Sequence, residues 1–337
     1  AATVPSMRAV MCRELVEPEE LTVEELDNLP CGPDRVRVRI WASGVNYVDA
    51  LFVQGQYQIK PPLPFIPGSE IAGELTEVGP EVERWEVGDR VMASVGLGGF
   101  ADEIVLRADQ LTRIPDRLSF GQAATMGQSY CTAWFTLTRR TVLRPEDWVV
   151  IFGAAGGVGL AMLDVARSFG AHTVAVASSS EKLQLAIERN ANAVIDSSDA
   201  GSDGATMRAR IREVTDGGAD IVIDPVGGTL TEEGLRGLRE GGRLMVIGFA
   251  SGSIPTLPAN QVLLRNRSVL GVDWGAWALG HPAENAALLG EVLAQVDAGA
   301  LEPVEPTMVP LEDAGTALRD LIERRVVGKV ALESRAR

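Results

Sequence analysis

The stretch that decides the fold is Ile151–Lys182, IFGAAGGVGLAMLDVARSFGAHTVAVASSSEK. An apolar run ending at Phe152 leads into a glycine-rich segment, then into leucines and alanines at helical spacing as far as Gly170. A second apolar run, Thr173–Ala177, follows, so the predicted order is strand, turn, helix and strand. Glycines in such a turn allow close backbone approach to a phosphate, which the amides of the helix N-terminus can bind. The stretch therefore predicts a dinucleotide-binding turn.

The predicted pyrophosphate contacts are the backbone groups of this turn: Ala155, Gly156, Gly157, Val158 and Gly159. A purely structural tight turn is the alternative. The strand–turn–helix context, inside a repeated pattern of strands and helices, favours cofactor binding.

The end of the second predicted strand indicates which dinucleotide binds. Enzymes that use NAD usually place Asp or Glu there to bind the ribose 2′-hydroxyl, whereas here the strand runs into three serines. A carboxylate would repel a 2′-phosphate, but Ser178 and Ser179 leave room for one, and Lys182 can pair with it. Alternatively, Ser178 and Glu181 form a capping box and Lys182 is simply solvated. Both arrangements can coexist, and we expect NADPH rather than NADH.

The region around this stretch alternates strands with helices. Its other predicted strands, several of them continuous apolar runs, are Trp148–Phe152, Ala193–Asp196, Asp220–Asp224, Arg243–Ile247 and Ser268–Val272. Such runs are typical of a parallel sheet covered on both faces. We therefore expect a doubly wound α/β domain over residues 126–276.

The chain before this domain is rich in short strands. Arginine alternates with valine and isoleucine over Arg35–Ile40, and similar strands are predicted at Ile71–Val78, Arg90–Ser94 and Ala101–Leu106. This spacing favours a small barrel or sandwich over residues 1–125, with residues 1–6 as an extension.

The last part of the chain, residues 277–337, is too small for a core of its own. It contains a predicted helix at Pro282–Ala298, a second helix, and a strand at Lys329–Glu333. We expect it to return and complete the first domain.

Composition excludes several classes of protein. The 337 residues include 46 acidic and 31 basic ones, a net charge of −15, and nucleic-acid binding needs clustered positive charge. We therefore expect no nucleic-acid partner and no adsorption to anionic membranes. No apolar run reaches the roughly 18 residues of a membrane span, and the first residues do not resemble a signal peptide. Cys12, Cys31 and Cys131 are scattered, which fits a reducing compartment, so we expect a cytoplasmic protein.

In its motifs the chain resembles the medium-chain dehydrogenase/reductase superfamily, in its zinc-independent NADPH:quinone oxidoreductase (zeta-crystallin-like) branch. The resemblance covers Met7–Glu333 and rests on Gly44–Asp49 (GVNYVD), Pro67–Gly73 (PGSEIAG), Val87–Val91 (VGDRV), Ala154–Gly159 (AAGGVG) and Leu264–Val269 (LRNRSV). It implies an α/β fold in which both ends of the chain form a GroES-like β-barrel catalytic domain around a central Rossmann domain. That agrees with the organisation predicted above.

The chain departs from the zinc-dependent members of the superfamily at the positions of their zinc ligands. Those enzymes place a Cys ligand near Val45–Tyr47 and a His immediately before Glu70, whereas here there is no Cys and Ser69 replaces the His. The four-Cys structural zinc lobe is absent, and neither His172 nor His281 has a partner ligand at suitable spacing. We therefore expect no metal.

Without a metal, a hydrogen-bond donor is needed near the acceptor oxygen, where negative charge develops during hydride transfer. The resemblance places Asn46 near the nicotinamide. It matches Tyr57 to a pocket tyrosine of quinone reductases and to the tyrosine regarded as proton donor in 2-enoyl thioester reductases. A second pocket tyrosine of some quinone reductases is Leu51 here. The structural alternatives are that Tyr57 packs against Pro61–Pro64 as part of a lid, and that Asn46 is a turn-capping amide.

The resemblance also implies further cofactor contacts. It places Thr132 near the cofactor, Gly248, Phe249 and Ala250 beside the nicotinamide ribose, and Val272, Asp273 and Trp274 at the carboxamide, with Lys329 as another phosphate contact. Each of these is equally compatible with an ordinary loop or strand residue. A family tyrosine near the 2′-phosphate is Ser197 here.

We therefore expect an enzyme that transfers hydride from NADPH to a small carbonyl or quinone substrate, either a quinone or an α,β-unsaturated carbonyl compound. One alternative is a 2-enoyl thioester (enoyl-CoA or enoyl-ACP) reductase of the same superfamily. The other, of a different class, is a non-catalytic NADPH-binding sensor or scaffold. The apolar sixth strand lies at the predicted sheet edge, and exposed edges tend to be covered or paired. The resemblance implies that this edge pairs across a twofold axis, so we expect a homodimer.

Overall fold

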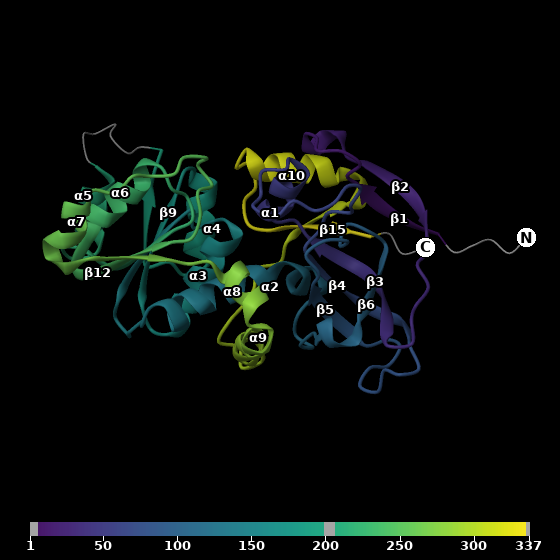
Figure 1. The fold of residues 1–337 in the computed structure, drawn as a ribbon. Coiled ribbons are helices and arrows are strands. Elements are labelled where there is room, and N and C mark those ends of the chain that lie inside the picture. Colours follow the sequence, from purple (N-terminus) through teal and green to yellow (C-terminus); the bar gives the residue numbers. More distant parts are fainter. Residues whose placement is uncertain (1–5, 199–205, 335–337) are drawn as a thin grey trace, which may run out of the picture. The chain divides into compact units, whose positions relative to one another are not determined.

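The computed structural model describes residues 6–198 and 206–334. The chain divides into two compact units (Figure 1). One contains the chain up to Gln128 and again from Val304, and the other runs from Ser129 to Pro303. The first boundary falls inside helix α2, Phe120–Phe135.

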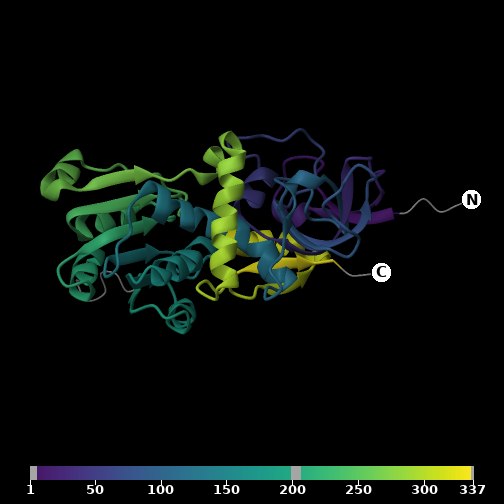
Figure 2. The ribbon, with the colours of Figure 1, turned by 90° about the horizontal axis from the view of Figure 1, so that it is seen from below.

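The second boundary differs from the one expected at residue 277. Helix α9, Pro282–Asp297, belongs to the second unit, where it is the long light-green helix of Figure 2. The indole nitrogen of Trp134 donates to Glu291 at 2.7 Å, and that of Trp274 donates to Asn285 at 2.9 Å. These contacts hold α9 against its own unit, so the chain returns to the first unit only at Val304.

The second unit is built on a six-stranded sheet in the order β10-β9-β8-β11-β12-β13, with every neighbouring pair parallel. The strands are β8 Trp148–Phe152, β9 His172–Ala177, β10 Ala193–Asp196, β11 Ala219–Asp224, β12 Leu238–Val246 and β13 Ser268–Gly271. The order reverses between β8 and β11, which is the topological switch point of a Rossmann fold.

Both faces of this sheet are buried, as continuous apolar strands require. One face, which includes Val150 and Phe152, packs with Ile211 and Leu235 in a single core cluster. Residues on the other face, such as Ile151, are equally buried. The helices of this unit are α3 Gly157–Ser168, α4 Ser180–Glu188, α5 Met207–Val214, α6 Thr229–Gly237, α7 Ala259–Leu263, α8 Trp274–Gly280 and α9.

The first unit contains a mostly antiparallel seven-stranded sheet and a two-stranded one, β1 with β2. Its elements are β1 Ser6–Met11, β2 Thr22–Asp27, β3 Arg35–Gly44, α1 Tyr47–Val53, β4 Glu70–Val78, β5 Arg90–Ser94, β6 Glu103–Arg107, β7 Thr112–Arg113, β14 Thr307–Pro310, α10 Ala314–Ile322 and β15 Val330–Glu333. Alternation in Arg35–Ile40 places Val36, Val38 and Ile40 in the core, and β3 continues beyond the prediction to Gly44.

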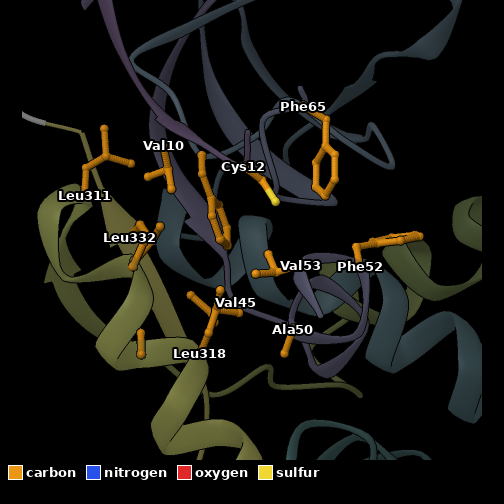
Figure 3. Packing of buried hydrophobic residues seen from close by; sticks show 13 residues of the cluster. Val10, Cys12, Val45, Ala50, Phe52, Val53, Phe65, Leu311, Leu318 and Leu332 are labelled. Carbon is orange, nitrogen blue, oxygen red and sulfur yellow. The ribbon is translucent and has the colours of Figure 1, made fainter. Parts of the chain in front are cut away.

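Both ends of the chain build one core of the first unit (Figure 3). Val10 and Cys12 come from the N-terminal part, and Leu311, Leu318 and Leu332 come from the C-terminal part. The residues from 304 onward therefore complete this unit. The predicted fold class, a GroES-like domain with a Rossmann domain, is confirmed. None of the described helices is both long and apolar enough to cross a membrane.

Candidate functional site

The glycine turn after β8 has the geometry predicted for it. Gly153 has a φ of +61°, which favours glycine, and helix α3 begins at Gly157 with Gly156 as its N-cap. A Cβ on Gly159 would lie 2.4 Å from the carbonyl oxygen of Gly153. Gly159 is therefore needed for the helix to begin so close to the turn.

The N-terminus of α3 has no side-chain cap. The Ser179, Thr206 and Asp273 side chains cap α4, α5 and α8, respectively, whereas α3 begins at a glycine. The first amides of any helix have no partner inside the helix. Those of α3 are therefore available to an anionic ligand at the carboxyl end of β8.

The serine-rich end of β9 corrects one prediction. The N-cap of α4 is Ser179, whose hydroxyl accepts from the amide of Lys182 at 3.4 Å. Ser178 is exposed and lies before the cap, so the expected capping box from Ser178 to Glu181 is not formed. Three adjacent serines offer the same capping chemistry, and the backbone conformation selects the last one before the helix.

The loop with Gly248, Phe249 and Ala250 is held by a neighbouring loop. The buried carboxylate of Asp224, at the end of β11, accepts hydrogen bonds from the amides of residues 226 and 227 and from the Thr231 hydroxyl at 2.6 to 2.9 Å. In the loop that Asp224 orders, the carbonyl of residue 225 accepts a hydrogen bond from the amide of Ala250 at 3.1 Å. Sequence analysis missed Asp224, although an acidic residue at a strand end before Pro-Val-Gly-Gly is a detectable signal.

The remaining predicted cofactor residues of the second unit follow β13 or lie on α2. The amide of Val272 continues the sheet by donating to Val246, and Asp273 caps α8 by accepting from the amide of Ala276 at 3.0 Å. The Trp274 indole is tied to α9. Thr132 is partly buried, and its carbonyl accepts from a hydroxyl one helical turn on. Apart from Thr132, all the predicted residues of this unit therefore lie at the carboxyl edge of one parallel sheet.

The first unit contains a buried polar cluster around Asn46, which precedes α1. The Asn46 side-chain nitrogen Nδ2 donates to Glu70 Oε2 at 2.8 Å, and its Oδ1 accepts from Lys329 Nζ at 3.0 Å. The other Glu70 oxygen accepts from the backbone amide of Gln128 at 2.6 Å. The Asn46 backbone amide donates to Asp49 at 2.9 Å, so Asp49 orders this segment.

Burial shifts the ionisation of the charged groups in this cluster. It raises the pKa of Asp49 to about 7, with hydrogen bonds from the Asn46 amide and Ser69 opposing the shift. It also raises the pKa of Glu70 and lowers that of Lys329, while the attraction between these two groups opposes both shifts. Lys329 is only 8% exposed, which suits a place in this cluster better than the predicted cofactor-phosphate contact.

Tyr57, the predicted proton donor, lies after α1. Its ring packs edge-on against Phe52, with the ring centroids 5.0 Å apart, at the margin of the core cluster drawn in Figure 3. It is partly buried, so it has both a packing role and some access to solvent. Asn46 and Tyr57 thus flank the same short helix.

Zinc does not fit the residues of this cluster. The described residues hold no group of three or more His, Cys, Asp or Glu side chains that could bind a metal ion. Structural and catalytic zinc sites use thiolate and imidazole ligands with carboxylates. Here Glu70 accepts from the Asn46 side-chain amide and the Gln128 backbone amide, and the Lys329 ammonium, bound to the same Asn46 side chain, would repel a metal cation.

Two protein-family models match the chain. Residues 32–116 match the alcohol dehydrogenase GroES-like domain, and residues 157–291 match the zinc-binding dehydrogenase family. Quinone oxidoreductase-like protein 2 of Bos taurus is 37% identical over 326 residues, covering 96% of this chain and 92% of that protein. Quinone oxidoreductase of Mus musculus is 31% identical over 319 residues, covering 94% of each chain.

Solved structures agree with these matches. Mycobacterial Rv1454c, solved in complex with NADPH, is 28% identical with a TM-score of 0.85 and covers 97% of this chain and 100% of its own. A protein described as an NAD-dependent alcohol dehydrogenase is 31% identical with a TM-score of 0.87 and the same coverage. With relatives more than 30% identical along nearly its whole length, the chain belongs to the quinone oxidoreductase branch of the medium-chain dehydrogenase/reductase superfamily.

Proposed function

We propose that this protein is an NADPH-dependent oxidoreductase that reduces quinones or α,β-unsaturated carbonyl compounds by hydride transfer. The observation that carries the proposal is the uncapped glycine turn at the N-terminus of α3, at the carboxyl end of β8 next to the switch point of the sheet. Such crevices are where open α/β sheets bind dinucleotides. The quinone oxidoreductase relatives support the reaction class.

We infer that the second unit binds most of the cofactor. The first amides of α3, those of residues 157–159, suit the pyrophosphate, while the Gly156 amide closes the turn by donating to the Gly153 carbonyl at 3.0 Å. Ser178 and Lys182 suit the 2′-phosphate, with Ser179 capping the same helix. We assign Gly248–Ala250 to the nicotinamide ribose, Val272–Trp274 to the carboxamide, and Thr132 and Asn46 to the nicotinamide end. The assignments at the nicotinamide, its ribose and its carboxamide follow the family resemblance.

The bound cofactor supplies a hydride. The protein must then stabilise the charge that develops on the acceptor oxygen and provide a proton. We assign the first task to the Asn46 amide, a fixed hydrogen-bond donor, and the second to the Tyr57 hydroxyl. The poor fit of zinc to the Asn46 cluster supports a zinc-independent reaction.

An enoyl thioester reductase of the same superfamily is the second candidate. It would need a channel for a thioester and basic groups for the phosphates of its carrier, and the net charge of −15 disfavours the latter. A non-catalytic NADPH-binding sensor or scaffold is the candidate of another class. The retention of both Asn46 and Tyr57 argues against it.

One experiment separates these candidates. NADPH oxidation is followed with 9,10-phenanthrenequinone, a simple enone and crotonyl-CoA as acceptors in parallel. We expect turnover with the quinone or the enone and much slower turnover with the thioester. Efficient reduction of crotonyl-CoA alone would establish the enoyl reductase, and NADPH binding without turnover of any acceptor would favour the non-catalytic candidate.

We also propose that the protein is a homodimer in the cytoplasm. The edge strand β13 exposes Val269, which is 38% accessible, and Leu263 and Leu264 before it are 77% and 53% accessible. An exposed apolar sheet edge is usually covered or paired. The cytoplasmic location is supported by three free cysteines without a disulfide, Cys12, Cys31 and Cys131.

A further inference from the structure

The side-chain amide of Asn46 is held at both ends by charged groups. Its nitrogen donates to the Glu70 carboxylate, and its oxygen accepts from the Lys329 ammonium. A flipped amide would point its oxygen at a carboxylate and its NH2 at an ammonium, so both hydrogen bonds would be replaced by repulsive contacts. The two charges therefore select one orientation of the amide.

The fold fixes the two partners independently of Asn46. In the antiparallel pairing of β15 with β3, Ala331 lies opposite Gly44, and the amide of Val45 donates to the carbonyl of Val330 at 3.0 Å. The same register carries Lys329, the residue before β15, to Asn46.

Glu70 is fixed from the other side. It is the first residue of β4, and its second oxygen accepts from the backbone amide of Gln128 on α2. A Cβ on the adjacent Gly127 would lie 2.7 Å from Glu70 Oε1, so the carboxylate leaves no space for a side chain there. The carboxylate is thus clamped between Asn46 and the backbone of α2.

In this arrangement one N–H of the Asn46 amide is bonded to Glu70, and the second N–H is not used by that bond. The Asn46 nitrogen carries two hydrogens, of which Glu70 takes one. Asn46 itself is 9% exposed, so its carboxamide is almost removed from water. A fixed N–H in such a place is pre-organised to meet a developing negative charge.

We propose that Glu70 and Lys329 are positioning residues that lock the Asn46 amide with its remaining N–H directed at the reacting oxygen of the acceptor. The proposal rests on the proposed function and extends it, because it assigns Lys329 to transition-state stabilisation through Asn46 and away from the cofactor phosphates. Lys329 and Glu70 act only through the amide, and neither touches the acceptor.

The test is a double-variant cycle on Lys329 and Asn46, measured with NADPH and 9,10-phenanthrenequinone. Lys329→Met should lower kcat roughly 10- to 100-fold, because an unlocked amide misplaces its N–H. The KM for NADPH and its Kd from fluorescence titration should change less than about threefold, since no phosphate contact is lost. A large rise in the Kd for NADPH would overturn the proposal in favour of a phosphate contact.

The cycle gives the sharper result. Asn46→Ala should lower kcat as much as Lys329→Met does or more, and the double variant should be no slower than Asn46→Ala alone. Losses that multiply in the double variant would show that Lys329 acts independently of Asn46 and would overturn the proposal. Lys60→Met, at an exposed loop position, is the matched control and should leave kcat unchanged.

Two further variants guard against misfolding. Lys329→Gln keeps a donor for Asn46 Oδ1 without the charge and should recover part of the activity lost in Lys329→Met. Glu70→Gln with Lys329→Gln keeps the cluster neutral. If both fold, as judged by thermal melting, and kcat stays at the wild-type value in the paired variant, the charges do not orient the amide and the proposal fails.

A spectroscopic measurement keeps this inference separate from the proposed function. In ¹⁵N-labelled protein, the Asn46 side-chain NH2, identified by its loss in Asn46→Ala, should be protected from exchange with solvent and should lose that protection in Lys329→Met. A wild-type protein that turns over none of the acceptors would refute the proposed reaction and leave this measurement valid. Rapid exchange in the wild type would refute the locked amide itself.

Discussion

Asp49 is a fully buried carboxyl group whose Oδ1 has no hydrogen-bond partner, and burial raises its pKa to about 7. The folded protein therefore holds this proton more tightly than the unfolded chain, in which an Asp titrates near 4. Its contribution to stability is complete below about pH 4 and is lost as the pH rises through about 7. The whole effect is on the order of 4 kcal/mol.

Asp49→Asn should remove this pH dependence. The amide oxygen of Asn can still accept from the Asn46 backbone, so the segment stays ordered while the ionisable group is lost. The melting temperature of the variant, relative to wild type, should be clearly higher at pH 8 than at pH 5. Asp116→Asn, at an exposed position, is the control and should show no such trend. An equal difference at both pH values would contradict the raised pKa.

Lys182 lies in the first turn of α4, three residues after the Ser179 cap. If it pairs with the 2′-phosphate, Lys182→Ala should raise the KM for NADPH roughly 10-fold and barely change that for NADH, because one charge-assisted contact is lost. Gln184→Ala, on the exposed side of the same helix, is the matched control. Equal changes for both cofactors would refute the assignment.

Tyr57→Phe tests the role of the Tyr57 hydroxyl separately from that of its ring. Phenylalanine keeps the edge-on contact with Phe52, so the packing of the ring is preserved in Tyr57→Phe. If the hydroxyl assists protonation, turnover should fall roughly 100-fold, the range expected for loss of a general acid. Turnover within twofold of wild type, at an unchanged melting temperature, would mean that Tyr57 is a packing residue only.

At the scale of secondary-structure elements, the residue pattern within a short segment predicted the strands and helices that depend on that pattern alone. The strands of the parallel sheet were predicted correctly because short continuous apolar runs are typical of strands buried on both faces. The helix after the glycine turn was found because its apolar residues recur at helical spacing. The start of β12 at Leu238 was missed, since Arg239–Gly242 has the composition of a turn although the structure keeps it in the strand.

Such local patterns could not predict the contacts among Asn46, Glu70 and Lys329, for a physical reason. Glu70 and Lys329 lie 24 and 283 residues from Asn46 along the chain. Only the pairing of β15 with β3 and of β3 with β4 brings them together, and the sequence does not state that register. Family resemblance supplied Asn46 and Lys329 as separate candidates but not the contact between them.

The turn before α3 makes a prediction at this scale. Gly159→Ala should lower the melting temperature, because its Cβ would overlap the Gly153 carbonyl and the overpacking costs about 1–3 kcal/mol. Gly156→Ala is the matched control for stability, since the nearest atom to its Cβ is 3.4 Å away and its φ of −83° suits alanine. Similar destabilisation by both substitutions would contradict this account of the turn.

At the scale of the whole molecule, the open question is what covers the edge of the parallel sheet. Strand β13 pairs with β12 on one side only, at the end of the strand order. In Figure 2 it belongs to the light-green segment along the margin of the second unit. A second copy of the chain is the occupant that we propose, because the exposed residues there are apolar and a sheet edge can continue across a twofold axis.

Val269→Lys should therefore convert the dimer to a monomer, since a charge at the centre of β13 would be buried unpaired in the interface. Light scattering coupled to size-exclusion chromatography would measure the change from twice the chain mass to once that mass. Ile187→Lys replaces an equally apolar residue, 49% exposed on α4, and should leave the dimer intact. A wild-type protein that elutes as a monomer at micromolar concentration, or a Val269→Lys variant that remains dimeric, would show that β13 is not the interface.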